Sequence, residues 1–121
     1  MVLKVNGVDI VPYIAHRGVK WQRSDIDSES AGRDLTGTLR RDRVATKRRL
    51  DITCRPMTTA EASVVLTAIL PETVSVEFTD PQSGGVISKT MYSNNNPATY
   101  FIQKDDGVEW WEGITFPLIE V

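Results

Sequence analysis

The chain has 121 residues, of which 40% are hydrophobic and 25% are charged, and it contains one cysteine. This length and composition predict one soluble domain, residues 1–121, whose core needs neither metal nor disulfide. No signal-peptide pattern occurs and no apolar run approaches the roughly 20 residues of a membrane-spanning helix, so we expect a protein made in the cytoplasm without contact to a membrane.

Charge is distributed unevenly along the chain. The net charge is only −2, but residues 33–55 carry eight basic and three acidic side chains, and residues 56–121 carry two basic and nine acidic ones. Complementary potentials favour register and orientation between molecules, so the basic segment suits the acidic face of another copy of the chain. The alternative is that both segments face solvent.

The N-terminal part predicts a short hairpin and then a strand that becomes polar. Residues 2–5 and 8–11 flank Asn6-Gly7, the pair that a type I′ hairpin turn favours. Strand-like alternation resumes over residues 13–24. Residues 25–37 are rich in Ser, Asp and Gly and have almost nothing to bury, which predicts a long loop.

The main structural prediction concerns residues 33–55. Leu50, Ile52 and Cys54 alternate with polar residues, as in a strand with one face on a core, so we expect the Cys54 thiol to be buried and inert. The near end, residues 39–49, holds six cations and too little apolar surface to pack. A strand over residues 38–55 would be about 60 Å long, whereas a globule of this length is about 35 Å across. We therefore predict a protruding hairpin arm over about residues 19–47.

After Pro56 the spacing of the apolar residues changes from that of a strand to that of a helix. Thr58 and Glu61 match a capping box, in which each side chain satisfies the other residue's unpaired backbone amide. Apolar residues at helical spacing follow as far as Pro71. They predict one amphipathic α-helix over about residues 58–70, with its apolar stripe on a sheet: Ala62, Val65, Leu66, Ile69 and Leu70.

The remainder predicts strands at residues 74–78, 86–92, 98–103 and 108–121. Trp110 and Trp111 are neighbours on the last of these and point to opposite faces, so one of them is left at the surface or in a contact. Together the elements predict a mainly β fold with one helix. We expect an antiparallel β-sandwich or barrel, flanked by the helix and carrying the arm.

The sequence offers no set of residues for catalysis. His16, the only histidine, lies on the polar parity of its strand, and no nucleophile-elbow pattern accompanies it. One histidine and one cysteine leave only scattered carboxylates as metal ligands, and the glycine pairs lack the context of a phosphate-binding loop. We therefore predict a protein that is not an enzyme and holds no cofactor or metal.

Binding of nucleic acid through residues 33–55 is the alternative function. Eight cations could follow a phosphate backbone, and a β-ribbon can enter a groove. Against this interpretation, the body is acidic and the basic stretch is interrupted by Asp34, Asp42 and Asp51. No aromatic side chains lie within it to stack on bases.

Three runs resemble a family of small prophage proteins of Gram-positive bacteria that are encoded among tail genes. They are SDIDSESAGR from Ser24 to Arg33, followed by Gly37, then RDRVATKRRL from Arg41 to Leu50, and the ending WEGITF from Trp111 to Phe116. In layout the chain is similar to tail-tube and distal-tail (baseplate hub) proteins of long-tailed phages. These are β-sandwich or barrel domains that form rings, commonly hexameric, through long loops or hairpins. The large C-terminal domain of a full distal-tail protein is missing, so tail tube and tail tip both stay open.

The resemblance implies a place in the virion tail after synthesis in the bacterial cytoplasm. We predict a structural subunit of a long-tailed phage or prophage tail, either of the tail tube or of the tail-tip (distal-tail) adaptor. It would assemble into rings with copies of itself through the arm and contact neighbouring tail proteins. The expected interface residues are Arg33, Arg40, Arg41, Arg43, Lys47, Arg48, Arg49 and Trp111.

Overall fold

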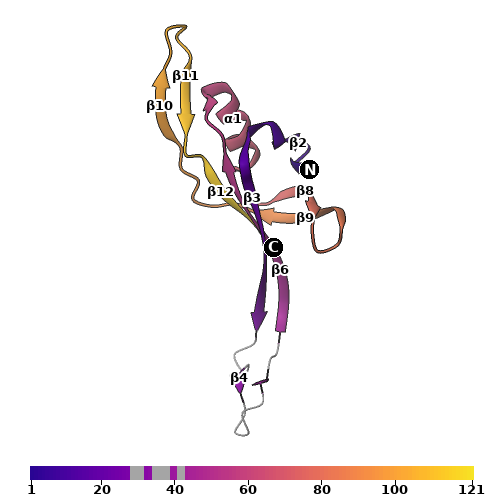
Figure 1. Ribbon diagram of the computed structural model, residues 1–121. Helices are drawn as coiled ribbons and strands as arrows, with labels where there is room; N and C mark the ends of the chain where they lie inside the picture. The colour runs from indigo at the N-terminus through magenta and orange to yellow at the C-terminus, as the bar shows by residue number, and fades with distance from the viewer. Residues whose placement is uncertain (28–31, 34–38, 41–42) are drawn as a thin grey trace.

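The computed structural model describes residues 1–27, 32–33, 39–40 and 43–121, with side chains for residues 1–23 and 46–121. The body consists of a curled seven-stranded antiparallel sheet that forms a half-barrel, a smaller three-stranded sheet and one α-helix (Figure 1). The predicted mainly β fold with one helix is therefore confirmed. Of the two predicted architectures, the curled sheet is closer to a barrel than to a sandwich.

The large sheet has the order β2-β1-β8-β9-β12-β6-β3. Its strands are β1 (Leu3–Val5), β2 (Val8–Asp9), β3 (Ile14–Asp27), β6 (Arg43–Cys54), β8 (Val74–Asp80), β9 (Gly85–Tyr92) and β12 (Thr115–Glu120). The small sheet has the order β10-β11-β7 and contains β7 (Met57–Thr58), β10 (Thr99–Gln103) and β11 (Glu109–Glu112). The remaining elements are the paired strands β4 (Gly32–Arg33) and β5 (Leu39–Arg40), the 3-10 turn η1 (Val11–Tyr13) and the helix α1 (Thr59–Ala68).

The large sheet and the helix share one hydrophobic core. Along β8 the side chains of Val74, Val76 and Phe78 are buried, whereas Ser75 and Thr79 are exposed, as the alternation in the sequence predicts. Other strands and the helix contribute further buried side chains to the same core, among them Leu3, Val5, Leu50, Ile52, Cys54, Val65, Met91, Phe116 and Leu118. The predicted burial of the Cys54 thiol is thereby confirmed.

The helix begins at the predicted capping box. The Glu61 amide donates to Oγ1 of Thr58 over 3.3 Å, and the Thr58 amide donates to Oε1 of Glu61 over 3.2 Å. The helix ends at Ala68, two residues before its predicted end, and Ile69 forms the C-cap with φ −96° and ψ 0°. Leu70 therefore lies outside the helix and is 78% exposed, so its predicted place on the apolar stripe is wrong.

The predicted single strand over residues 108–121 is also wrong. Gly113 adopts φ 68°, a left-handed conformation that favours glycine, and the chain changes sheet at this point. β11 pairs with β10 and β7 in the small sheet, whereas β12 pairs with β6 and β9 in the large one. The break places Trp110 and Trp111 on the β10–β11 hairpin instead of in the strand that closes the core.

β3 and β6 form the long hairpin that the sequence predicts. Their register runs from Val19↔Ile52 to Asp27↔Arg43, so β3 continues three residues into the predicted loop. The two strands leave the body at one end, and the β10–β11 hairpin lies at the opposite end (Figure 1). Parts of the predicted arm and loop lie outside the described residues, namely 28–31, 34–38 and 41–42.

A β-bulge interrupts β3 inside the body. The register with β6 shifts between Ile14 and Val19, and Arg17 within this shift has φ 59°. Gly18 is buried there, and a Cβ at this position would overlap the backbone carbonyl oxygen of Thr53 on β6. Glycine thus allows the close approach of the two strands from which the arm extends.

The substitution Gly18→Ala should destabilise the protein by about 2 kcal/mol, because the added methyl group must push β3 away from β6. Urea unfolding monitored by circular dichroism measures this difference. Gly85→Ala is the matched control, since a Cβ at Gly85 would meet no atom within 4 Å. Equal midpoints for the two variants would contradict the prediction.

Candidate interaction site

The arm begins where β12 ends. β12 pairs with β6 from Thr115↔Thr53 to Ile119↔Arg49, and beyond Arg49 the only described strand paired with β6 is β3. At this junction the backbone amide of Arg48 donates to Oε2 of Glu120 over 2.8 Å. The carboxylate of Glu120 thus provides the acceptor that a further backbone carbonyl of β12 would have provided.

An ion pair at the same level joins β6 to β8. Nε of Arg48 lies 3.3 Å from Oδ1 of Asp80, and the Asp80 side chain is completely buried while that of Arg48 is 17% exposed. Oδ2 of Asp80 accepts a hydrogen bond from the Ser83 amide over 2.9 Å, in the turn between β8 and β9. β9 and β12 separate β8 from β6 in the sheet, so the curl of the sheet is what brings the pair together.

Opposing effects act on the Asp80 carboxyl. Burial disfavours its charged form and raises its pKa, whereas hydrogen bonds from Ser83 and the positive charge of Arg48 lower it. The lowering effects are stronger together, so the pKa of Asp80 lies below its ordinary value of 3.8. The pair is therefore charged at neutral pH and links the base of the arm to the body.

The other two cations at the arm base also have partners in their own chain. Nζ of Lys47 donates to the carbonyl oxygen of Val121 over 2.7 Å, and Nη2 of Arg49 lies 3.0 Å from Oδ1 of Asp51. Lys47, Arg48 and Arg49, which the sequence assigns to an interface between copies, therefore make contacts that hold the arm base within one copy.

The remaining predicted interface cations lie further along the arm. Arg33, Arg40 and Arg43 belong to β4, β5 and β6, where the structure describes the backbone, and Arg41 lies outside the described residues. Their contact with another copy stays a prediction. Sequence reasoning misses Asp80, although it stands two residues after Phe78 on the inward parity of β8, where a carboxylate needs a partner.

Trp111, the last predicted interface residue, packs between the small sheet and the helix. Its Nε1 donates to Oγ1 of Thr59 over 2.9 Å, and its ring meets that of Tyr100 edge-on with centroids 5.4 Å apart. A hollow of about 320 Å³ opens beside it, lined by Thr59, Ala62, Ser63, Leu66, Ala98 and Trp111. The indole is thus positioned by its own chain at the edge of a surface hollow.

The other groups considered for chemistry are His16, Cys54 and the scattered carboxylates. His16 is exposed on β3, and no group of three or more His, Cys, Asp or Glu side chains in the described residues could hold a metal ion. Burial raises the pKa of the Cys54 thiol to about 11, against a lowering effect of Arg55, so little reactive thiolate exists at neutral pH. In the part of the chain that the structure describes, no helix is long and apolar enough to cross a membrane.

The substitution Asp80→Asn should destabilise the protein most at neutral pH. It removes the counter-charge of Arg48 but keeps an oxygen for the Ser83 amide, and we expect a loss of about 3 kcal/mol in the free energy of unfolding. Because the folded-state pKa of Asp80 is lowered, its contribution is complete above the ordinary pKa of 3.8 and is lost as the pH falls through the lower folded-state pKa.

Urea unfolding of the variant and the unaltered chain at about pH 7 and about pH 3 measures this contribution, and the difference between them should shrink at the lower pH. Glu72→Gln, an exposed charge removal between α1 and β8, is the control and should change little at either pH. A difference between Asp80→Asn and the unaltered chain that is independent of pH would rule out the charged pair as its cause.

Comparison with known proteins places the chain in a family. No curated protein and no solved structure matches it. A family model matches residues 1–121, and its description is family of unknown function (DUF6711). Since the match covers the whole sequence, the chain belongs to the DUF6711 family.

Proposed function

We propose that the protein is a structural subunit that assembles with copies of itself through the arm formed by β3 and β6, in the tail of a long-tailed phage or prophage. The assembly rests on the geometry of the arm. The place in a tail rests on the resemblance of residues 24–33, 41–50 and 111–116 to prophage tail proteins. Both a tail-tube ring and a tail-tip adaptor, each with neighbouring tail proteins, fit this proposal.

The observation that carries the proposal is the continuation of the β3–β6 ladder beyond the last partner in the body. Between Arg49 and Arg43, β6 has β3 as its only described neighbour. A two-stranded ribbon is marginally stable by itself in water, and its outer edges present unpaired amides and carbonyls. A ribbon of this form gains stability when a strand of another molecule completes it.

The arm base supports this role because it sets the direction of the arm. Arg48 contacts Glu120 through its amide and Asp80 through its side chain, so β6 is held to two other strands where it leaves the body. Segments that are already held in position lose less conformational freedom on binding than free tails do. The arm is therefore suited to a defined contact with a partner.

The same contacts reduce the support for nucleic-acid binding through residues 33–55. Lys47, Arg48 and Arg49 already have oxygen partners in their own chain. Each phosphate contact made by such a cation would have to replace one of these partners, so fewer cations are available to follow a phosphate backbone.

Replacing residues 25–46 by Asn-Gly should abolish assembly and leave the body folded. Ser24 and Lys47 are directly paired across the ladder, so a two-residue type I′ turn can join them. We expect the full chain to form oligomers and the shortened chain to be monomeric in size-exclusion chromatography with light scattering over a range of concentrations.

Circular dichroism and thermal unfolding of the shortened chain control for the folding of its body. A full chain that stays monomeric at every concentration, or a shortened chain that oligomerises equally well, would contradict the proposal. Salt-dependent retention of DNA by a monomeric full chain, lost on changing Arg41, Arg43 and Arg48 to Ala, would favour the alternative function.

A further inference from the structure

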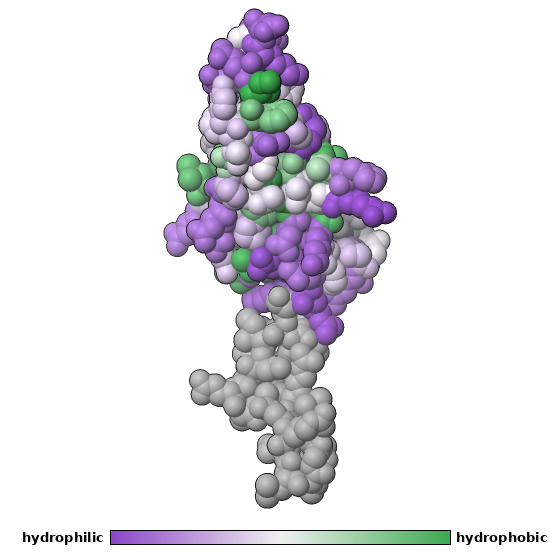
Figure 2. Space-filling view, turned by 60° about the vertical axis from the view of Figure 1, so that its left-hand side comes forward, coloured by the Kyte–Doolittle hydropathy of each residue, from purple (hydrophilic) through white to green (hydrophobic). Residues whose placement is uncertain are grey.

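The β10–β11 hairpin exposes apolar side chains at the end of the body opposite the arm, where green residues interrupt a purple surface in Figure 2. All five residues of β10 are exposed, and Tyr100, Phe101 and Ile102 are 48%, 52% and 45% exposed. β10 is the edge strand of the small sheet, so among the described residues its outer edge has no strand partner. Open apolar edges of this kind are sites of pairing with another chain.

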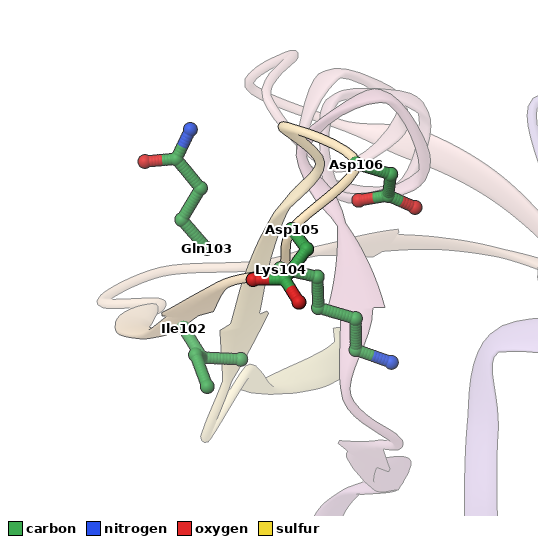
Figure 3. Close-up of a pocket in the computed structure, with 5 residues that line it drawn as sticks. All are labelled: Ile102, Gln103, Lys104, Asp105 and Asp106. Carbon is green, nitrogen blue, oxygen red and sulfur yellow. The ribbon is translucent and has the colours of Figure 1, made fainter.

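The turn of this hairpin is polar and mainly acidic. It surrounds a hollow of about 520 Å³, and Figure 3 shows its lining residues Ile102, Gln103, Lys104, Asp105 and Asp106. Gln103 and Lys104 point to opposite sides of the hairpin (Figure 3), and Nζ of Lys104 lies 4.4 Å from the ring centroid of Trp110. Residues 99–112 carry four carboxylates and this one lysine, so the hairpin as a whole is negatively charged.

The arm offers a second open edge, on β6. The amides of Arg48 and Cys54 both donate to acceptors in or beside β12. Because backbone groups alternate along a strand, the even-numbered residues of β6 direct their amides and carbonyls to the β12 side. β12 pairs with β6 no further than Arg49, which leaves the backbone groups of Thr46 directed outward, with no described strand opposite them. Nearer the tip the β3–β6 register shifts between Ile26↔Ala45 and Asp27↔Arg43, so the alternation does not extend to Val44.

We propose that β10 of one copy pairs with the open edge of β6, residues 43–47, in the arm of the next copy. This inference rests on the proposed self-assembly through the arm and identifies the surface that receives it. The two edges are similar in length, since β10 has five residues and β6 continues for six beyond Arg49, of which Arg48 already has its amide bound by Glu120. Each edge contains one register shift, near Phe101 in β10 and near Val44 in β6. Their charges are complementary in part. Residues 43–49 contain four cations opposite the acidic hairpin, but three of these have oxygen partners in their own chain, and β3 contributes Asp25 and Asp27 to the same part of the ladder.

Such a contact is head-to-tail. The two edges are different surfaces at opposite ends of one molecule, so each copy receives one neighbour's arm on β10 and offers its own arm to another neighbour. Contacts of this type produce closed rings or open filaments. Pairing of β10 with β10 would instead be symmetric and would end at a dimer.

Two variants block one edge each. Thr46→Pro removes an amide that points away from β3, so the ladder within the arm is kept. Phe101→Lys combined with Ile102→Lys places two charges on β10. In light scattering after size-exclusion chromatography we expect each variant alone to be monomeric. An equimolar mixture should form a dimer, because one intact pair of edges remains between the two chains.

Leu70→Lys is the matched control, since it changes an even more exposed apolar side chain that belongs to neither β10 nor β11, and this variant should assemble like the unaltered chain. If the unaltered chain assembles and the β10 variant does so equally well, this inference fails while assembly through the arm stands. If Thr46→Pro assembles normally, or if the mixture stays monomeric, pairing of β10 with β6 is excluded. An unaltered chain that is monomeric overturns both proposals.

Disulfide cross-linking between introduced cysteines is a second test, because the one native cysteine, Cys54, is buried and should not react. Chains with Thr46→Cys and chains with Phe101→Cys should form a disulfide-linked dimer when they are mixed and oxidised. Phe101→Cys alone should cross-link at least tenfold more slowly. Equally fast cross-linking of Phe101→Cys with itself would indicate β10–β10 pairing and overturn the inference.

Discussion

The ladder between β3 and β6 is the interaction on which both the body and the arm depend. Within residues 49–52, β6 lies between β3 and β12 and buries Leu50 and Ile52 in the core. Further along, the same strand has β3 as its only described neighbour, and its sequence becomes cationic. Because the strand is continuous, the packing of its buried half determines the direction in which its other half leaves the body.

At the arm base, where β12 ends beside β6, two carboxylates provide partners for the backbone amide and the side chain of Arg48. Glu120 accepts the Arg48 amide, and Asp80 pairs with the Arg48 guanidinium across the curled sheet. A buried ion pair stabilises a fold little compared with apolar residues of the same volume, although breaking it is costly. We therefore infer that the Arg48–Asp80 pair mainly fixes the orientation of β6 relative to β8 and contributes less to the stability of the body.

The sequence predicts those elements whose pattern continues over several residues. The capping box of α1, the alternation of β8 and the hairpin over β3 and β6 all follow from such patterns. The break at Gly113 and the bulge at Gly18 depend on one residue each and on its surroundings, so hydrophobic periodicity does not show them. Composition identifies the cations of the site, but the pairing of Arg48 with Asp80 depends on the curl of the sheet, which no local pattern encodes.

Burial of the apolar side chains of β10 would not be enough to hold two copies together. Burying the exposed parts of Tyr100, Phe101 and Ile102 would contribute on the order of 5 kcal/mol. Association costs about 4–15 kcal/mol in lost freedom, so backbone hydrogen bonds along β6 and complementary charge must provide the rest. In a closed ring, removal of one copy breaks two such contacts at once. A copy in a closed ring is therefore held more firmly than a partner in a dimer that a single such contact joins.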